Sequence, residues 1–85
     1  MVETPENRLR RLHMRSIRRG IKEMDLILAN FSEKRLANLS TDDLDIYEDL
    51  LSENDHDLYA WVTNQAPAPD RFKALMTQIS EAFER

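Results

Sequence analysis

The residues best suited to binding chemistry are the arginines near the start of the chain. Residues 8–22 contain seven basic side chains and no acidic one. A solvated helix face usually mixes both signs, because opposite charges three or four positions apart stabilise a helix. An arginine guanidinium also presents its N–H donors as a planar fork that fits a carboxylate. This stretch therefore predicts a surface for an anionic partner.

The charge of the whole chain is divided unevenly. Residues 1–35 carry a net charge of +4 and residues 36–85 a net charge of −8, which together give −4. A protein that binds nucleic acid through phosphates usually has an overall basic surface. A small nucleic-acid-binding module is therefore an alternative that the acidic second half disfavours. An antitoxin-like or adaptor module that docks another protein is the second alternative.

No set of residues in the sequence is spaced for catalysis. The chain has no cysteine and one glycine, which excludes thiolate chemistry, cysteine-based metal sites and glycine-rich phosphate loops. His13 and His56 lie far apart and lack metal-binding spacing. The Asp55-His56-Asp57 cluster lacks the glycine and glutamate of a calcium loop and is more typical of a helix start. We therefore expect neither an enzyme nor a metal site.

The first half of the chain predicts two helices with a break between them. Thr4 is suited to cap a helix that has Pro5 in its first turn and runs to about Arg18. A second apolar stripe begins near Gly20. If this stripe and the first, Leu9 and Leu12, belonged to one straight helix, they would point about 100° apart. A bend near Gly20, where a positive φ is least costly, resolves this conflict. The second stripe consists of Ile21, Met24, Leu28 and Phe31.

The second half predicts three further helices. Ser40 and Asn54 are suited to cap the first two, and a stiff connector over residues 66–70 precedes the third. Residues 32–39 are left open, either as an extension of the second helix or as a separate turn. The predicted fold is all-α, a compact five-helix bundle in a single domain over residues 1–85, with residues 1–6 as a loose N-terminal segment. The three apolar stripes are Leu44, Tyr47, Leu50 and Leu51; then Leu58, Trp61 and Val62; then Phe72, Leu75, Met76, Ile79 and Phe83.

Two aromatic residues of the helix predicted after Asn54 face in different directions. Trp61 shares a helix face with core residues and is expected to pack inside. Tyr59 points elsewhere and is a candidate for a partner contact. The longest apolar run, residues 26–29, is too short to cross a membrane. We therefore expect no membrane insertion.

Two motifs resemble the succinate dehydrogenase assembly factors, which are also called flavinylation factors. Arg18-Arg19-Gly20-Ile21-Lys22-Glu23 resembles their R-G-x-x-E motif, and the likeness extends to Arg15-Ser16 and Met24-Asp25. Asp57-Leu58-Tyr59-Ala60-Trp61 resembles their D-L-x-x-W helix, preceded by Leu50-Leu51 and Asn54-Asp55. One departure is Asn64-Gln65-Ala66, where many relatives have a glycine.

The resemblance implies an assembly chaperone without catalytic turnover. Its partner would be the flavoprotein subunit of succinate dehydrogenase or fumarate reductase, and it would promote covalent attachment of FAD to a histidine of that subunit. The chain itself would bind no FAD and no nucleic acid, and would be a monomer. Its location would be the bacterial cytoplasm, or the mitochondrial matrix in a eukaryote. The implied partner-binding residues are Arg15, Arg18, Arg19, Gly20, Glu23, Asp25 and Tyr59.

Overall fold

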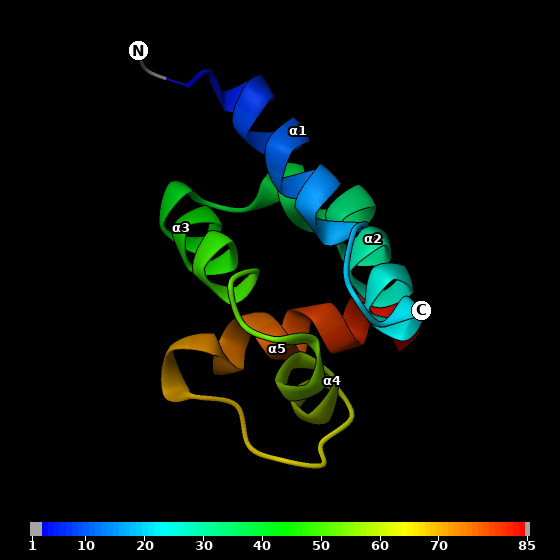
Figure 1. The fold of residues 1–85 in the computed structure, drawn as a ribbon. Coiled ribbons are helices and arrows are strands. Elements are labelled where there is room, and N and C mark those ends of the chain that lie inside the picture. Colours follow the sequence, from blue (N-terminus) through cyan, green and yellow to red (C-terminus); the bar gives the residue numbers. More distant parts are fainter. Residues whose placement is uncertain (1–2, 85) are drawn as a thin grey trace.

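The computed structural model describes residues 3–84, which form five α-helices and no β-strand. The predicted all-α, five-helix architecture is therefore confirmed (Figure 1). The helices are α1 (Pro5–Ser16), α2 (Lys22–Arg35), α3 (Thr41–Leu50), α4 (Asp55–Val62) and α5 (Asp70–Glu84), with a short 3₁₀ helix, η1 (Leu36–Asn38), directly after α2.

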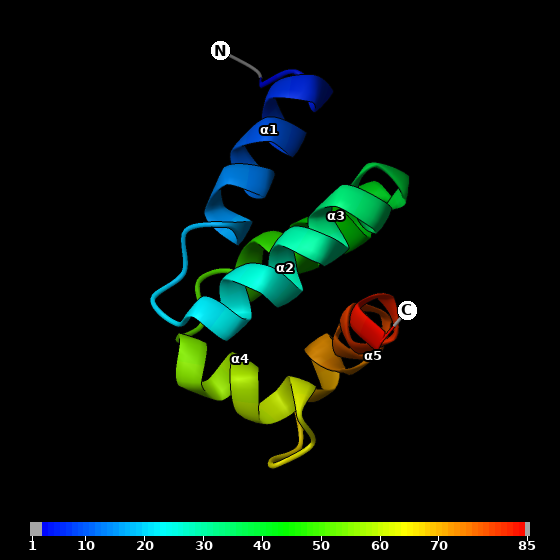
Figure 2. The same ribbon diagram turned by 90° about the vertical axis from the view of Figure 1, so that its right-hand side faces the viewer.

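Helix α2 is the centre of the packing. It contacts α1, α4 and α5, and α5 is contacted in turn by α3 and α4. In both ribbon views α1 lies at the end of the molecule that carries the N-terminus, whereas α4 lies at the opposite end (Figures 1 and 2). A helix with neighbours on several sides needs apolar residues around more than one face. The buried residues of α2 meet this need: Met24, Ile27, Leu28, Phe31 and Ser32.

The core joins residues from every α-helix. Phe31 of α2 and Tyr47 of α3 are fully buried, with ring centroids 5.5 Å apart. The Ser16 hydroxyl lies 2.7 Å from the Leu12 carbonyl and 2.6 Å from the Tyr47 hydroxyl. Because Ser16 donates its proton to Leu12, Tyr47 donates to Ser16. Burial raises the pKa of Tyr47 to about 12, so this phenol is neutral and serves as a polar tie between α1 and α3.

The predicted helix starts are confirmed by their caps. The side chains of Thr4, Ser40 and Asn54 each accept the backbone N–H of the residue three positions later. The first helix thus includes Pro5 and Glu6, which corrects the assignment of residues 1–6 to a loose segment; residues 1–2 lie outside the described part. The open segment 32–39 is divided between the end of α2 and η1.

Three sequence-based expectations need correction. The first helix ends at Ser16 and the second begins at Lys22, so the bend is a loop of five residues, 17–21. Gly20 does not adopt a positive φ, so left-handed backbone is not the reason for glycine there. Phe83 is 49% exposed although it continues the apolar stripe of α5, and Ala82 is buried in its place.

Candidate functional site

The loop between α1 and α2 carries the R-G-x-x-E motif, and two aspartates hold its backbone. Asp25, one turn into α2, accepts the backbone N–H of Arg19 at 2.5 Å. Asp55, the first residue of α4, accepts the backbone N–H of Gly20 at 2.5 Å. Ile21, the N-cap of α2, has no side-chain hydrogen bond of its own. The backbone of the loop is therefore held by carboxylates from α2 and α4, while the first turn of α2 has no side-chain cap.

Arg19 is bound within the chain itself. Its Nε donates to Asp55 Oδ1 at 2.6 Å, and its two terminal nitrogens donate to the carbonyls of Leu51 and Glu53 at 2.7 and 2.8 Å. The side chains of Arg19 and Asp55 are only 11% and 14% exposed. The Arg19 guanidinium, which we expected to bind a partner, thus donates its hydrogen bonds to the turn between α3 and α4 and to the start of α4. We call the Arg19–Asp55 pair and these carbonyls the latch.

The electrostatics of the latch favour an ionised Asp55. Burial alone would raise the pKa of this carboxyl, but hydrogen bonds from Arg19 and from the backbone of Gly20 and Ile21 outweigh it and hold the pKa below its usual value. The same carboxylate explains the glycine. A Cβ on Gly20 would lie 3.0 Å from Asp55 Oδ2, so the loop needs a residue that lets the carboxylate approach its backbone.

The other predicted residues of the motif point toward solvent. Arg18, Gly20 and Glu23 are exposed, and no described residue forms a hydrogen bond or ion pair with the side chains of Arg18 and Glu23. Arg15 is half-buried and makes one long contact of 3.4 Å to the Ser52 hydroxyl. Arg18 in the loop and Glu23 in the first turn of α2 therefore stand beside the latch with side chains that are exposed and unpaired among the described residues.

The basic run is less free than its sequence indicates. Arg8 pairs with Asp45 at 2.6 Å, and Arg11 pairs with Glu3 at 2.8 Å and with Glu48 at 3.0 Å. The hydrogen bond from Arg11 lowers the pKa of Glu48. Acidic residues of α3 thus neutralise the first part of the run, which sequence spacing could not reveal. A hollow beside the run is lined by Arg11, Met14, Arg15, Arg18 and Arg19. Of these arginines, Arg15 and Arg18 form no ion pair among the described residues.

The structure brings Tyr59 close to Glu23. Both line a mostly apolar hollow between α2, α4 and α5. Tyr59 is half-buried, so the predicted partner contact can involve only part of its ring. Asp25 serves as the loop cap described above. The predicted site residues therefore fall into two groups. Arg19, Gly20 and Asp25 take part in the hydrogen bonds that hold the loop, whereas Arg15, Arg18, Glu23 and Tyr59 are at least partly exposed.

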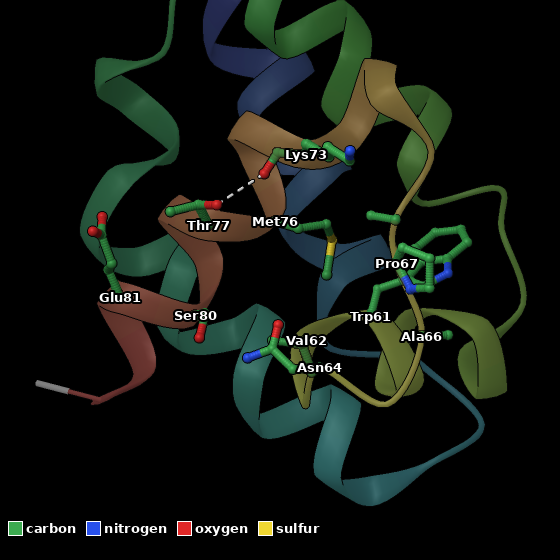
Figure 3. Close-up of a pocket in the computed structure, with 11 residues that line it drawn as sticks. Trp61, Val62, Asn64, Ala66, Pro67, Lys73, Met76, Thr77, Ser80 and Glu81 are labelled. Carbon is green, nitrogen blue, oxygen red and sulfur yellow. Dashed lines mark hydrogen bonds between the residues drawn. The ribbon is translucent and has the colours of Figure 1, made fainter.

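A neighbouring hollow lies between α4, the connector and α5 (Figure 3). It is bordered by Trp61 and Pro67 on one side and by Met76 and Glu81 of α5 on the other. Trp61 is half-buried, with its ring centroid 6.0 Å from that of Phe72. It packs against the core but is only partly buried, so it lies at the margin of the core and not inside it as predicted.

Asn64 lies in the turn directly after α4. It has a φ of +61°, and the N–H groups of Asn64 and Gln65 donate to the carbonyls of Trp61 and Ala60. This is the Schellman arrangement, which usually requires glycine and tolerates asparagine. Asn64 therefore supplies the positive φ that this turn after α4 needs.

No group of three potential metal ligands occurs among the described residues. Across that same part of the chain, no helix has the length and apolarity needed to cross a membrane.

Comparison with known proteins matches this chain to one family. A family profile described as "Flavinator of succinate dehydrogenase" matches residues 10–83. The mitochondrial succinate dehydrogenase assembly factor 2 of Meyerozyma guilliermondii is 46% identical over 74 residues, covering 84% of this chain and 55% of that protein. The same factor from Candida glabrata is 40% identical, covering 84% and 48%, and that from Saccharomyces cerevisiae is 38% identical, covering 87% and 49%. This chain thus spans about half the length of these relatives. It belongs to the family of succinate dehydrogenase flavinators.

Proposed function

We propose that this chain is an assembly factor that binds the flavoprotein subunit of succinate dehydrogenase and promotes covalent attachment of FAD to that subunit. The observation that carries the proposal is the latched loop of a family member: Arg18 and Glu23 stand outward from a backbone that Asp25 and Asp55 hold in place. A fixed loop loses little conformational entropy on binding, which favours recognition of one defined surface.

The chain acts as a positioning partner in this proposal. Glu23 accepts hydrogen bonds and Arg18 donates them, so together they fit a partner surface that carries both a basic and an acidic group. The flavoprotein holds the FAD, and its own histidine forms the covalent bond. Ordering the flavoprotein around its cofactor favours that step by orientation. The assembly factor itself performs no catalytic turnover and works as a monomer, in the matrix of a mitochondrion or in a bacterial cytoplasm.

The distribution of charge supports a protein partner over nucleic acid. Arg8 and Arg11 are held by Asp45, Glu3 and Glu48, so they are not available to track phosphates. A nucleic-acid surface needs several free cations in a row. The outward Glu23 would also repel a phosphate backbone.

Covalent flavin incorporation tests the proposal. The apo flavoprotein subunit is mixed with FAD, with or without this chain, then denatured and separated, and flavin fluorescence is measured on the polypeptide. The proposal predicts faster or more complete covalent flavin when this chain is present. A helical peptide of equal positive charge serves as the control and should have no effect. Equal incorporation with the chain, with the peptide and with neither would contradict the proposal.

A further inference from the structure

An apolar hollow lies beside Glu23 of the motif, between α2, α4 and α5. It has a volume of about 370 Å³ and is lined by residues of α2, α4 and α5 and by the turn after α4. We call it the α2–α5 groove, after the helices that carry its two most exposed apolar side chains, Leu26 and Phe83. The full lining is Glu23, Leu26, Ile27, Tyr59, Val62, Thr63, Asn64, Ser80 and Phe83.

Leu26 and Phe83 are exposed more than their types would suggest. Leu26 is 55% exposed and Phe83 is 49% exposed, whereas the next apolar residue of α2, Ile27, is only 5% exposed. A single exposed apolar side chain is ordinary, but two that flank one apolar hollow form a patch, and such patches mark interaction surfaces. Asn30 of α2 donates to the Ala82 carbonyl at 2.8 Å, which connects the last turn of α5 to α2 beside this patch.

The charge of the groove indicates what it binds. Glu23 is the one charged residue in its lining, and it forms no ion pair among the described residues. It lies three positions before Leu26 on α2, so its carboxylate and the Leu26 side chain share one helix face. An occupant that covers the apolar residues must also approach this carboxylate. Burying an unpaired carboxylate is costly, so the occupant has to supply a cation beside its apolar side chains.

We propose that the α2–α5 groove binds a segment of the flavoprotein subunit that presents apolar side chains next to a lysine or arginine. The inference rests on the proposed function and extends its contact surface from the loop to the C-terminal turn of α5. Glu23 and Tyr59 belong to both surfaces. In this arrangement Glu23 pairs with the cation while Leu26 and Phe83 pack against the apolar side chains.

Affinity for the apo flavoprotein subunit tests the groove, with the full chain labelled and titrated at fixed salt. Leu26→Ser and Phe83→Ser replace exposed side chains and should leave the melting temperature nearly unchanged. Each should weaken binding by about tenfold, as expected for an apolar residue at the centre of an interface. Leu26→Met and Phe83→Leu are the matched controls. They keep the groove apolar and should bind within about twofold of wild type.

The outcomes separate the groove from the proposed function. If wild type binds and both serine variants bind equally well, the groove inference is wrong while the assembly role stands. If the serine variants instead abolish a dimer seen by sedimentation and leave flavoprotein binding intact, the occupant is a second copy and the inference is also wrong. If wild type fails to bind the flavoprotein, both proposals are overturned. Glu23→Lys adds a check on charge, because it should weaken binding more than Glu23→Gln.

Discussion

Removing Asp55 should destabilise the protein far more than removing another aspartate from the same helix turn. Asp55→Ala deletes the partner of a mostly buried Arg19, 2.6 Å away, and an acceptor of the Gly20 N–H. Breaking a buried ion pair by deleting one partner costs about 3–5 kcal/mol. Arg19 keeps two carbonyl acceptors, so we expect a smaller loss, about 2–4 kcal/mol. For a domain of this size that corresponds to a fall of about 10–25 °C in Tm.

The matched control is Asp57→Ala. Asp57 lies in the same first turn of α4 but is exposed, so the variant loses a similar interaction with the helix dipole without touching the latch. It should cost less than about 1 kcal/mol. Thermal unfolding followed by circular dichroism measures both. If the Tm of Asp55→Ala fell within a few degrees of that of Asp57→Ala, the latch would contribute little and the reasoning would be refuted.

Two further predictions concern Asp55 and Gly20, and a third concerns the turn at Asn64. The pKa of Asp55 in the folded protein is depressed below its usual 3.8. Its contribution to the free energy of unfolding is therefore present above pH 3.8 and is lost as the pH falls through the folded pKa. Urea titrations from about pH 6 down to about pH 2 should show that this free energy falls more steeply in wild type than in Asp55→Ala. Gly20→Ala should destabilise wild type by about 1 kcal/mol, because the added Cβ meets the Asp55 carboxylate. In the Asp55→Ala background the same change should be neutral or stabilising, because only the entropy gain of about 0.4–1 kcal/mol remains. An equal effect in both backgrounds would show that the carboxylate is not the reason for glycine. Asn64→Ala should lose about 1 kcal/mol in chemical denaturation while Asn64→Gly loses none, since Asn64 has a positive φ; equal stability of the two variants would contradict this.

Local signals in the sequence predicted the helices well. The helix caps are formed by side chains that accept the backbone N–H three residues later, in Thr4, Ser40 and Asn54. Because both partners are close in the chain, such caps can be predicted from residue types alone. The apolar stripes likewise gave most of the core. Phe83 shows the limit of that argument. It lies within about 20° of Phe72 around α5, but periodicity gives only a direction and does not show whether a neighbouring helix reaches that turn.

The sequence indicated which residues to consider for the candidate site but not how Arg19 and Gly20 are held. Arg19 and Gly20 were identified as partner contacts, and a resemblance between motifs cannot reveal that Arg19 reaches a carboxylate 36 positions away. The two motifs meet in space: the R-G-x-x-E loop rests on Asp55, two residues before the D-L-x-x-W segment. The glycine was attributed to backbone conformation, whereas the structure attributes it to the close approach of that aspartate. Long-range pairs of this kind leave no periodic trace in one sequence.

Arg19 is consequently a poor test of partner binding. Arg19→Ala would leave Asp55 without its cation in a largely buried place, so a loss of activity could come from the fold. The outward residues Arg18 and Glu23 avoid this difficulty, because no described residue pairs with their side chains. Arg10 is an exposed arginine of α1 outside both hollows and offers a matched control for the loss of one charge.

The rate of covalent flavin attachment to the flavoprotein subunit, measured with site variants of equal Tm, tests the central claim most directly. Glu23→Gln removes one charge-assisted hydrogen bond from the outward face, worth about 1.5–3 kcal/mol, so complex formation should fall about ten- to hundredfold at limiting concentration. Arg18→Gln should also slow the reaction, whereas Arg10→Gln should match wild type. If Glu23→Gln and Arg18→Gln sustained the wild-type rate at limiting concentration, the latched loop would not be the surface that the flavoprotein recognises.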